Sequence, residues 1–284
     1  MFKFGVSSFI WSENFNEKDL YLIEKAKSLG FEVIDLLVSH PESFPIKQVK
    51  KICKDVDIEP TTITVLNKDT NIIDPNEKVR RNGINFLKKL VDINTAIGSR
   101  ILGGVNYAAW GYLSGKPRTD NEWKWSVEAM KEVAEYAKDN SDIIIAVEPV
   151  NRFETFFLNI AEDAVRYCRE VGFDNMKVHL DSFHMIREEL NFTKAVQECG
   201  NQYLGYVHVC ESNRGIPGTG LVPWKEFFTA LKNISFEGPL VIESFDPKFE
   251  ELNRLCAIWR KFAETGEVLA IEGLRNLKNI EKSL

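Results

Sequence analysis

Four residues of types that bind metal ions stand at or near the ends of successive apolar runs in the second half of the chain. They are Glu148 in IIIAVEP, Asp181 in KVHLD, His208 in GYVHV and Glu243 in LVIES. Each lies roughly thirty residues from the next, the length of one strand followed by one helix in a repeating α/β fold. If the runs are parallel strands of one closed sheet, the four side chains converge at the carboxyl ends of the strands.

The donor types at these positions indicate which ion would bind. Three carboxylates and one imidazole suit a hard or borderline divalent cation such as Mn²⁺, Co²⁺ or Mg²⁺. A structural zinc site would more commonly use thiolates, but the five cysteines are scattered and include no CxxC pair. Cys210 follows His208 by two residues, and we interpret it as a small packing residue rather than a ligand.

Each of the four residues also has a simpler explanation on its own. Glu148 would accept hydrogen bonds from loop amides, and Asp181 would cap the helix expected in SFHMIREEL. His208 would be a core histidine, and Glu243 would pair with a lysine or arginine. Burying four such groups at one end of a sheet is unfavourable unless they share a partner. A common cation removes that penalty for all four, so we favour the metal site.

Strand-like and helical patterns alternate along the whole chain and predict eight strand–helix units. Strands are expected in KFGVSSF, FEVIDLLV, IEPTTITV, SRILGGV, DIIIAVEPV, MKVHLD, YLGYVHV and PLVIESF. Helices are expected at 17–30, 46–56, 75–97, 120–139 and 160–171, and near 184–199, 223–233 and 247–264.

This order predicts an α/β protein and favours a (β/α)8 TIM barrel with an extra C-terminal helix. We expect one domain over residues 1–284, which includes the C-terminal helix at 267–283. A doubly wound open sheet is the structural competitor, but no GxGxxG motif follows the first strand.

Other polar and aromatic residues fall in the loops that follow the strands. Arg214 stands in ESNRGIPGTG, a glycine-rich loop after the seventh strand, and its guanidinium would donate hydrogen bonds to sugar oxygens or to an enolate. Trp11 and Trp110 follow the first and fourth strands and would wall a sugar site, although tryptophan also simply fills cores.

Composition narrows the choice of partners. The chain has 284 residues, a net charge of −6 and 44% hydrophobic residues. The acidic balance argues against nucleic acid as a partner. No run approaches the roughly 18 apolar residues of a membrane span, and the N-terminus lacks a signal-peptide pattern. The scattered cysteines favour a reducing cytoplasm. We also expect a homo-oligomer, either a dimer or a tetramer.

Four separated stretches, VEPVNRFETFFLN, LDSFHM, HVCESNRGIPGTG and VIESF, occur in the order found in a known family. Together they resemble the ketose 3-epimerases, which act on D-tagatose, D-psicose or L-ribulose and belong to the xylose isomerase-like barrels. The resemblance implies a manganese or cobalt ion bound by the four residues named first. It also implies substrate contacts from Glu154, His184 and Arg214. The loops SSFIWSENF and VLNKDTN depart from the family, which leaves the preferred ketose open.

The expected reaction is epimerisation at C3 of a free ketose through a cis-enediolate. Glu148 and Glu243 would act as base and acid on opposite faces of the carbon, and the direction of reaction would decide which residue removes the proton. Four alternatives remain at this stage. They are an aldose–ketose or hydroxypyruvate-type isomerase, an inosose-type dehydratase, a nuclease of the endonuclease IV type and a non-catalytic sugar-binding barrel.

Overall fold

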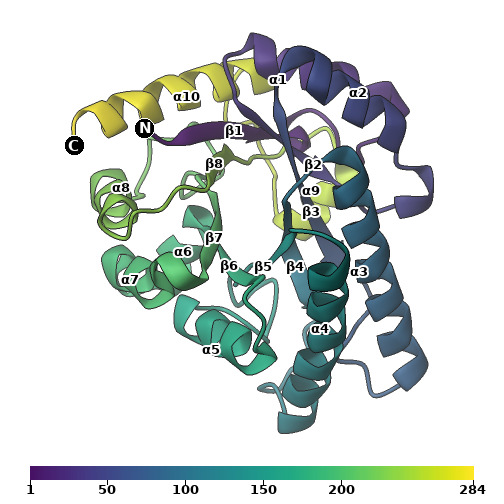
Figure 1. The fold of residues 1–284 in the computed structure, drawn as a ribbon. Coiled ribbons are helices and arrows are strands. Elements are labelled where there is room, and N and C mark those ends of the chain that lie inside the picture. Colours follow the sequence, from purple (N-terminus) through teal and green to yellow (C-terminus); the bar gives the residue numbers. More distant parts are fainter.

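Eight parallel strands form a closed barrel in the computed structural model of the protein, which describes residues 1–284 apart from the side chain of residue 251 (Figure 1). Strand order follows chain order, and β1 pairs with β8 from Lys3↔Pro239 to Val6↔Ile242, which closes the sheet. The strands are β1 (Lys3–Ser7), β2 (Val33–Leu37), β3 (Glu59–Leu66), β4 (Ile101–Ala109), β5 (Ile144–Val147), β6 (Met176–Asp181), β7 (Leu204–His208) and β8 (Pro239–Ile242). The predicted barrel is therefore confirmed, and the open sheet is excluded.

Helices cover the outside of the barrel, as Figure 1 shows. They are α1 (Tyr21–Ser28), α2 (Ile46–Val56), α3 (Glu77–Ile97), α4 (Asp120–Asn140), α5 (Ala161–Val171), α6 (Ser182–Glu188), α7 (Phe192–Tyr203), α8 (Trp224–Asn233), α9 (Glu250–Cys256) and α10 (Gly266–Lys282). Short 3₁₀ turns occur at Ser8–Ile10, Glu17–Asp19 and Pro41–Ser43. Polar caps define several helix ends: Thr119 and Glu122 form a capping box on α4, and Gly98 ends α3 in the left-handed conformation.

Two helical predictions are wrong in detail. The segment expected as one helix near 184–199 forms α6 and α7, because Glu189 is extended and the side chain of Asn191 caps a new helix. The segment 247–264 contains only the short helix α9, which ends where Ala257 adopts a left-handed conformation. The remainder of that segment is irregular, and Ile258 and Phe262 line a cavity together with Arg214.

The hydrophobic core lies in two layers on either side of the sheet. The larger layer packs between strands and helices, and its centre includes Leu22, Leu87, Met130 and Phe227. The smaller layer fills the inside of the barrel with residues from several strands: Val33, Ile63, Ile101, Ala146, Tyr206 and Val241. Inward-facing residues of this kind make the barrel a packed core rather than a pore, so chemistry is confined to its rim.

The C-terminal helix α10 packs beside the barrel next to β8 and α8. Leu269, Leu274 and Leu277 are buried on one face, and Gly273 gives close approach to Pro217 and Ile242. Its end lies beside the N-terminus, where the Phe2 amide donates a hydrogen bond to Glu281 at 2.7 Å (Figure 1). Among the described helices, none is both long enough and apolar enough to cross a membrane.

Candidate metal centre and active site

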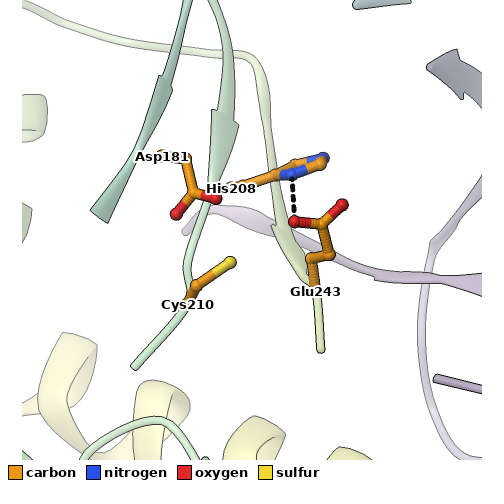
Figure 2. Close-up of side chains that lie close together, drawn as sticks. All are labelled: Asp181, His208, Cys210 and Glu243. Carbon is orange, nitrogen blue, oxygen red and sulfur yellow. Dashed lines mark ion pairs between the residues drawn. The ribbon is translucent and has the colours of Figure 1, made fainter. Parts of the chain in front are cut away.

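Side chains from three neighbouring strands meet at the carboxyl end of the barrel (Figure 2). Asp181 ends β6, His208 ends β7 and pairs in register with Asp181, and Glu243 follows β8. Their ligand atoms and the sulfur of Cys210 all lie within 4.8 Å of one another. All four side chains are buried, so the polar atoms must compensate one another or share a partner.

Glu148, just after β5, joins the same cluster from the side. One of its oxygens groups with ring nitrogens of His179 and His208, and an oxygen also groups with Asp181 and His184, in each case within 4.8 Å. These groups overlap through Asp181 and His208, so the structure brings the four predicted ligands to one end of the barrel, although they are separated in sequence by whole strand–helix units. We call the set Glu148, Asp181, His208 and Glu243 the rim cluster.

Asp181 has two roles because its two oxygens face different partners. Oδ1 accepts a hydrogen bond from the Phe183 amide at 2.7 Å and caps α6. Oδ2 accepts one from Arg214 at 2.8 Å and lies 3.8 Å from Nε2 of His184. The helix-capping explanation is thus correct for one oxygen, and the other remains directed into the rim cluster.

Arg214 lies across the cluster and neutralises part of its charge. Its Nη1 donates to Asp181 and to Glu243, the latter at 2.7 Å, and its guanidinium carbon lies 4.0 Å from the ring centroid of Phe183. Burial lowers the pKa of Arg214, but Asp181, Cys210 and Glu243 together raise it well above its ordinary value. The side chain therefore stays charged although it is buried.

The loop that carries Arg214 has an unusual backbone. Arg214 has a φ of +62°, a left-handed conformation that costs energy for a residue with a side chain. The loop is held by the buried carboxylate of Glu211, which accepts hydrogen bonds from the amides of Ser212, Gly218 and Val222 and from the Trp224 indole. The sequence motif identified a glycine-rich loop, but the structure shows that a buried acid determines its shape.

The charges of the rim cluster fit a divalent cation. Its three carboxylates carry three negative charges when ionised, and Arg214 offsets one of them. In the protein alone, burial and then repulsion from Asp181 and Glu243 raise the pKa of Glu148 well above its ordinary value. Burial lowers the pKa of His208, but Glu243 and Asp35 outweigh it and raise that pKa well above its ordinary value. A bound cation would lower both pKa values, because it favours the deprotonated forms that bind it.

The histidine and carboxylate beside the cluster form a second polar group. Nδ1 of His184 accepts a hydrogen bond from the Asn151 amide at 3.1 Å, which leaves its Nε2 directed at Glu148 and Asp181. Burial and then Arg214 lower the pKa of His184 well below its ordinary value, so the ring is neutral. Glu154 accepts hydrogen bonds from the Trp110 indole at 2.9 Å and from Asn151 at 2.7 Å.

Two cavities meet at this end of the barrel. The inner cavity is lined by residues that include Trp110, Glu148, Glu154, His184, Arg214 and Glu243. The outer cavity has a volume of about 490 Å³ and shares Glu154, Arg214 and Cys256 with the inner one. Trp11 lies elsewhere: it contacts Gly266 at the start of α10, and the Lys25 ammonium lies 4.9 Å from its ring.

Three residues in or beside the cluster were not expected from the sequence to take part in the site. Cys210 lies closer to the rim cluster than its interpretation as packing suggests, with its sulfur 2.9 Å from Nη1 of Arg214. Burial and then Asp181 raise the pKa of its thiol well above the ordinary value, so it lacks the thiolate that binds metals strongly. His179 and Asp35 are fully buried inside the barrel below the cluster. An acid within FEVIDLLV was the only sequence signal for Asp35.

Comparison with known proteins identifies the class to which this barrel belongs. Residues 23–280 match the family model described as xylose isomerase-like TIM barrel. A probable ketose 3-epimerase from Synechocystis sp. is 32% identical, with 97% of this chain and 96% of the relative covered. An L-ribulose 3-epimerase from Methylomonas sp. is also 32% identical, with the same two shares covered.

The crystal structure of D-allulose 3-epimerase from Methylomonas sp. in complex with D-allulose superposes with a TM-score of 0.93 at 30% identity, covering 98% of this chain and 96% of that one. The chain belongs to the ketose 3-epimerase family within the xylose isomerase-like TIM barrels. Because epimerases are isomerases, this membership identifies the chain as an enzyme of the isomerase class.

Proposed function

We propose that the protein catalyses metal-dependent epimerisation at C3 of a free ketose. The observation that carries this proposal is the presence of two buried glutamates, Glu148 and Glu243, after non-adjacent strands of one rim cluster. Their environments separate their pKa values. The pKa of Glu148 is raised. Burial raises the pKa of Glu243, but His208 and Arg214 outweigh burial and lower that pKa below its ordinary value. Two carboxyl groups whose pKa values are driven apart are the arrangement expected for an acid and a base.

The rim cluster would hold one divalent cation through Glu148, Asp181, His208 and Glu243. Mn²⁺ is the ion we favour, and Co²⁺ or Mg²⁺ would suit the same oxygen-rich donor set. When bound, the cation supplies Lewis-acid polarisation of the substrate carbonyl.

The protein side chains then perform the proton transfers. One glutamate takes the C3 proton, and the electron pair of the C–H bond moves into a cis-enediolate. The other glutamate returns a proton to the opposite face of C3 as the ketone re-forms. Arg214 and His184 hold substrate oxygens during both steps, with Glu154 and Trp110 beside them. We assign Trp11 no contact with the reacting carbons, because it lies beside the start of α10 and is not among the residues that line either cavity.

The substrate class follows from relatives rather than from this chain. The relatives named above include enzymes for L-ribulose and D-allulose, and one of them is complexed with D-allulose. We propose a free ketose of the D-fructose/D-psicose, D-tagatose or L-ribulose type. We further propose a cytoplasmic homo-oligomer, either a dimer or a tetramer. The exposed side chains of Phe153 and Leu255, which line the outer cavity, together with exposed Trp259, support self-association at this end.

The decisive test replaces each glutamate separately by glutamine. Glu148→Gln and Glu243→Gln should each lower the rate of C3 epimerisation by roughly 10³-fold or more, because each removes one of the two proton-transfer groups. Glu188→Gln is the matched control, since Glu188 pairs with Arg152 at 2.8 Å and is not part of the rim cluster. Turnover is followed by NMR in D₂O across a panel of ketoses, and Mn²⁺ affinity is measured for each variant.

The same experiment distinguishes the two-base scheme from its alternatives. A variant that retains one base should still exchange the C3 proton of one epimer with solvent without forming the other epimer. Near-normal epimerisation by either variant would contradict the scheme. An aldose product would indicate a 1,2-isomerase, and loss of water would indicate a dehydratase.

A further inference from the structure

A second layer of polar side chains lies inside the barrel, directly beneath the rim cluster. Asp35 of β2 is fully buried there, and its Oδ1 accepts hydrogen bonds from the hydroxyls of Thr61 and Tyr206, each at 2.8 Å. Its second oxygen, Oδ2, is buried and accepts no hydrogen bond from any described residue. A buried carboxylate oxygen of this kind requires a donor, because an unsatisfied charged acceptor is costly.

A ring nitrogen of His208 faces that oxygen. Nε2 of His208 lies 3.7 Å from Oδ2 of Asp35, while Nδ1 lies 3.5 Å from Oε2 of Glu243. The two ring nitrogens therefore face opposite layers, with Nδ1 in the rim cluster and Nε2 in the barrel interior. Aromatic neighbours restrict the ring on two sides: His179 at a centroid distance of 4.2 Å and Tyr206 at 5.1 Å.

We propose that Asp35 is the positioning residue of the metal centre. With a cation bound, Oδ2 would accept the Nε2–H of His208, which lies 3.7 Å away, and this would fix the tautomer that leaves the Nδ1 lone pair directed at the cation. Histidines that bind metals usually donate their other N–H to a carboxylate or carbonyl, and such partners tune affinity. Thr61 and Tyr206 in turn hold Asp35 from β3 and β7. This inference rests on the proposed metal site but not on the identity of the ketose.

The test is the substitution Asp35→Asn, which preserves the shape of the side chain. If the asparagine oxygen keeps the hydroxyl partners, its amide group faces Nε2 of His208 and opposes the required N–H. The other tautomer then carries its proton on Nδ1, where a cation cannot bind. We expect the dissociation constant for Mn²⁺, measured by calorimetry, to rise roughly 10- to 100-fold. The visible spectrum of the Co²⁺-loaded protein should shift, because the histidine–metal bond changes.

Two milder variants keep the proposal testable if Asp35→Asn does not fold. Thr61→Val and Tyr206→Phe each remove one hydroxyl donor from Asp35 and leave its charge in place. Each should weaken Mn²⁺ binding by a smaller factor than Asp35→Asn, and Glu59→Gln, a surface change on the same strand as Thr61, should not weaken it. A lower melting temperature in the interior variants, with metal affinity and the Co²⁺ spectrum unchanged, would show a purely structural role and overturn the proposal.

The test of Asp35 can fail or succeed independently of the test of the proposed epimerase reaction. If wild-type protein binds neither Mn²⁺ nor Co²⁺, both the metal site and the role of Asp35 are refuted. If the wild type binds metal but epimerises no ketose, the proposed reaction fails while the effect of Asp35→Asn on affinity still decides the positioning role.

Discussion

Replacement of Glu211 by glutamine tests whether a buried carboxylate shapes the loop that carries Arg214. Oε1 of Glu211 accepts hydrogen bonds from the Ser212 and Val222 amides at 2.7 and 3.2 Å, and Oε2 accepts them from the Gly218 amide and the Trp224 indole at 3.0 and 3.1 Å. A glutamine oxygen can replace only one of these acceptors. Its NH₂ group would face two N–H donors and leave both without a partner.

The expected loss of stability follows from these contacts. Two hydrogen bonds to a charged acceptor, each contributing about 1.5–3 kcal/mol, would be lost, so the free energy of unfolding should fall by roughly 3 kcal/mol or more. For a chain of this length that corresponds to a decrease in melting temperature of about 5 °C. Glu128→Gln is the control, because Glu128 is exposed on α4 and its nearest cation, Lys124, is 3.8 Å away. Its effect should stay within about 0.5 kcal/mol.

The loss of stability in Glu211→Gln should depend on pH in a predictable direction. Burial raises the pKa of Glu211, but N–H donors led by the Ser212 amide outweigh it and hold the pKa below its ordinary value. A carboxyl group with a lowered folded pKa stabilises the fold above its unfolded pKa, and that stability is lost as pH falls through the folded pKa. The difference between wild type and Glu211→Gln should therefore be full near pH 7 and shrink in acid.

Kinetics should separate the loop from the metal centre. Arg214 would be misplaced in Glu211→Gln, so kcat/KM should fall roughly 10- to 100-fold. Mn²⁺ affinity should change by a smaller factor than kcat/KM, because this loop supplies none of the four rim-cluster residues and acts on two of them only through Arg214. Differential scanning calorimetry from pH 4 to 8 and calorimetric Mn²⁺ titration provide the measurements. A melting temperature within about 1 °C of wild type at pH 7 would refute the role of Glu211 as an anchor.

Two further predictions concern metal removal and thiol reactivity. Protein dialysed against a chelator should lose turnover and regain it with Mn²⁺ or Co²⁺. Free metal at 100 times its dissociation constant should raise the free energy of unfolding by about 2.7 kcal/mol. Undiminished turnover after complete removal of metal would contradict the metal site. Burial raises the pKa values of the Cys53 and Cys168 thiols to about 12, so both remain protonated until the pH approaches that value. At pH 8.5 iodoacetamide should alkylate both thiols at least about 100-fold more slowly in the folded protein than in urea-unfolded protein. Peptide mass spectrometry measures the two rates, and equal rates would show that the thiols are not buried.

The positions of the barrel strands were predictable because each strand is marked by a local pattern. Continuous apolar runs separated by amphipathic helices specify eight parallel strands, and a closed parallel sheet necessarily gathers the residues at the strand ends. Glu148, Asp181, His208 and Glu243 all occupy such ends, so one topological rule was enough to bring them together.

Residues of the barrel interior were harder to predict because their direction depends on register. The pairing of β6 with β7 shifts between Val178 and His179, which places His179 opposite Tyr206. Gly103 then leaves the space that these two rings occupy, since a Cβ atom there would lie 3.0 Å from Tyr206 and 3.2 Å from His179. A sequence pattern does not contain that shift, and so the contact of His179 with Tyr206 inside the barrel was not predicted.

Buried acids outside the rim cluster have a common physical role in this protein. Asp35 is held by two hydroxyls and faces His208, and Glu211 is held by four N–H groups and shapes the loop of Arg214. An acid that binds a cation must keep its oxygens available, so it cannot also be fixed by many protein donors. Asp181 shows the compromise, with one oxygen spent on the α6 cap and the other directed into the cluster. Acids behind the cluster carry no such constraint, and in the proposed scheme they position the groups that would contact the cation and the substrate.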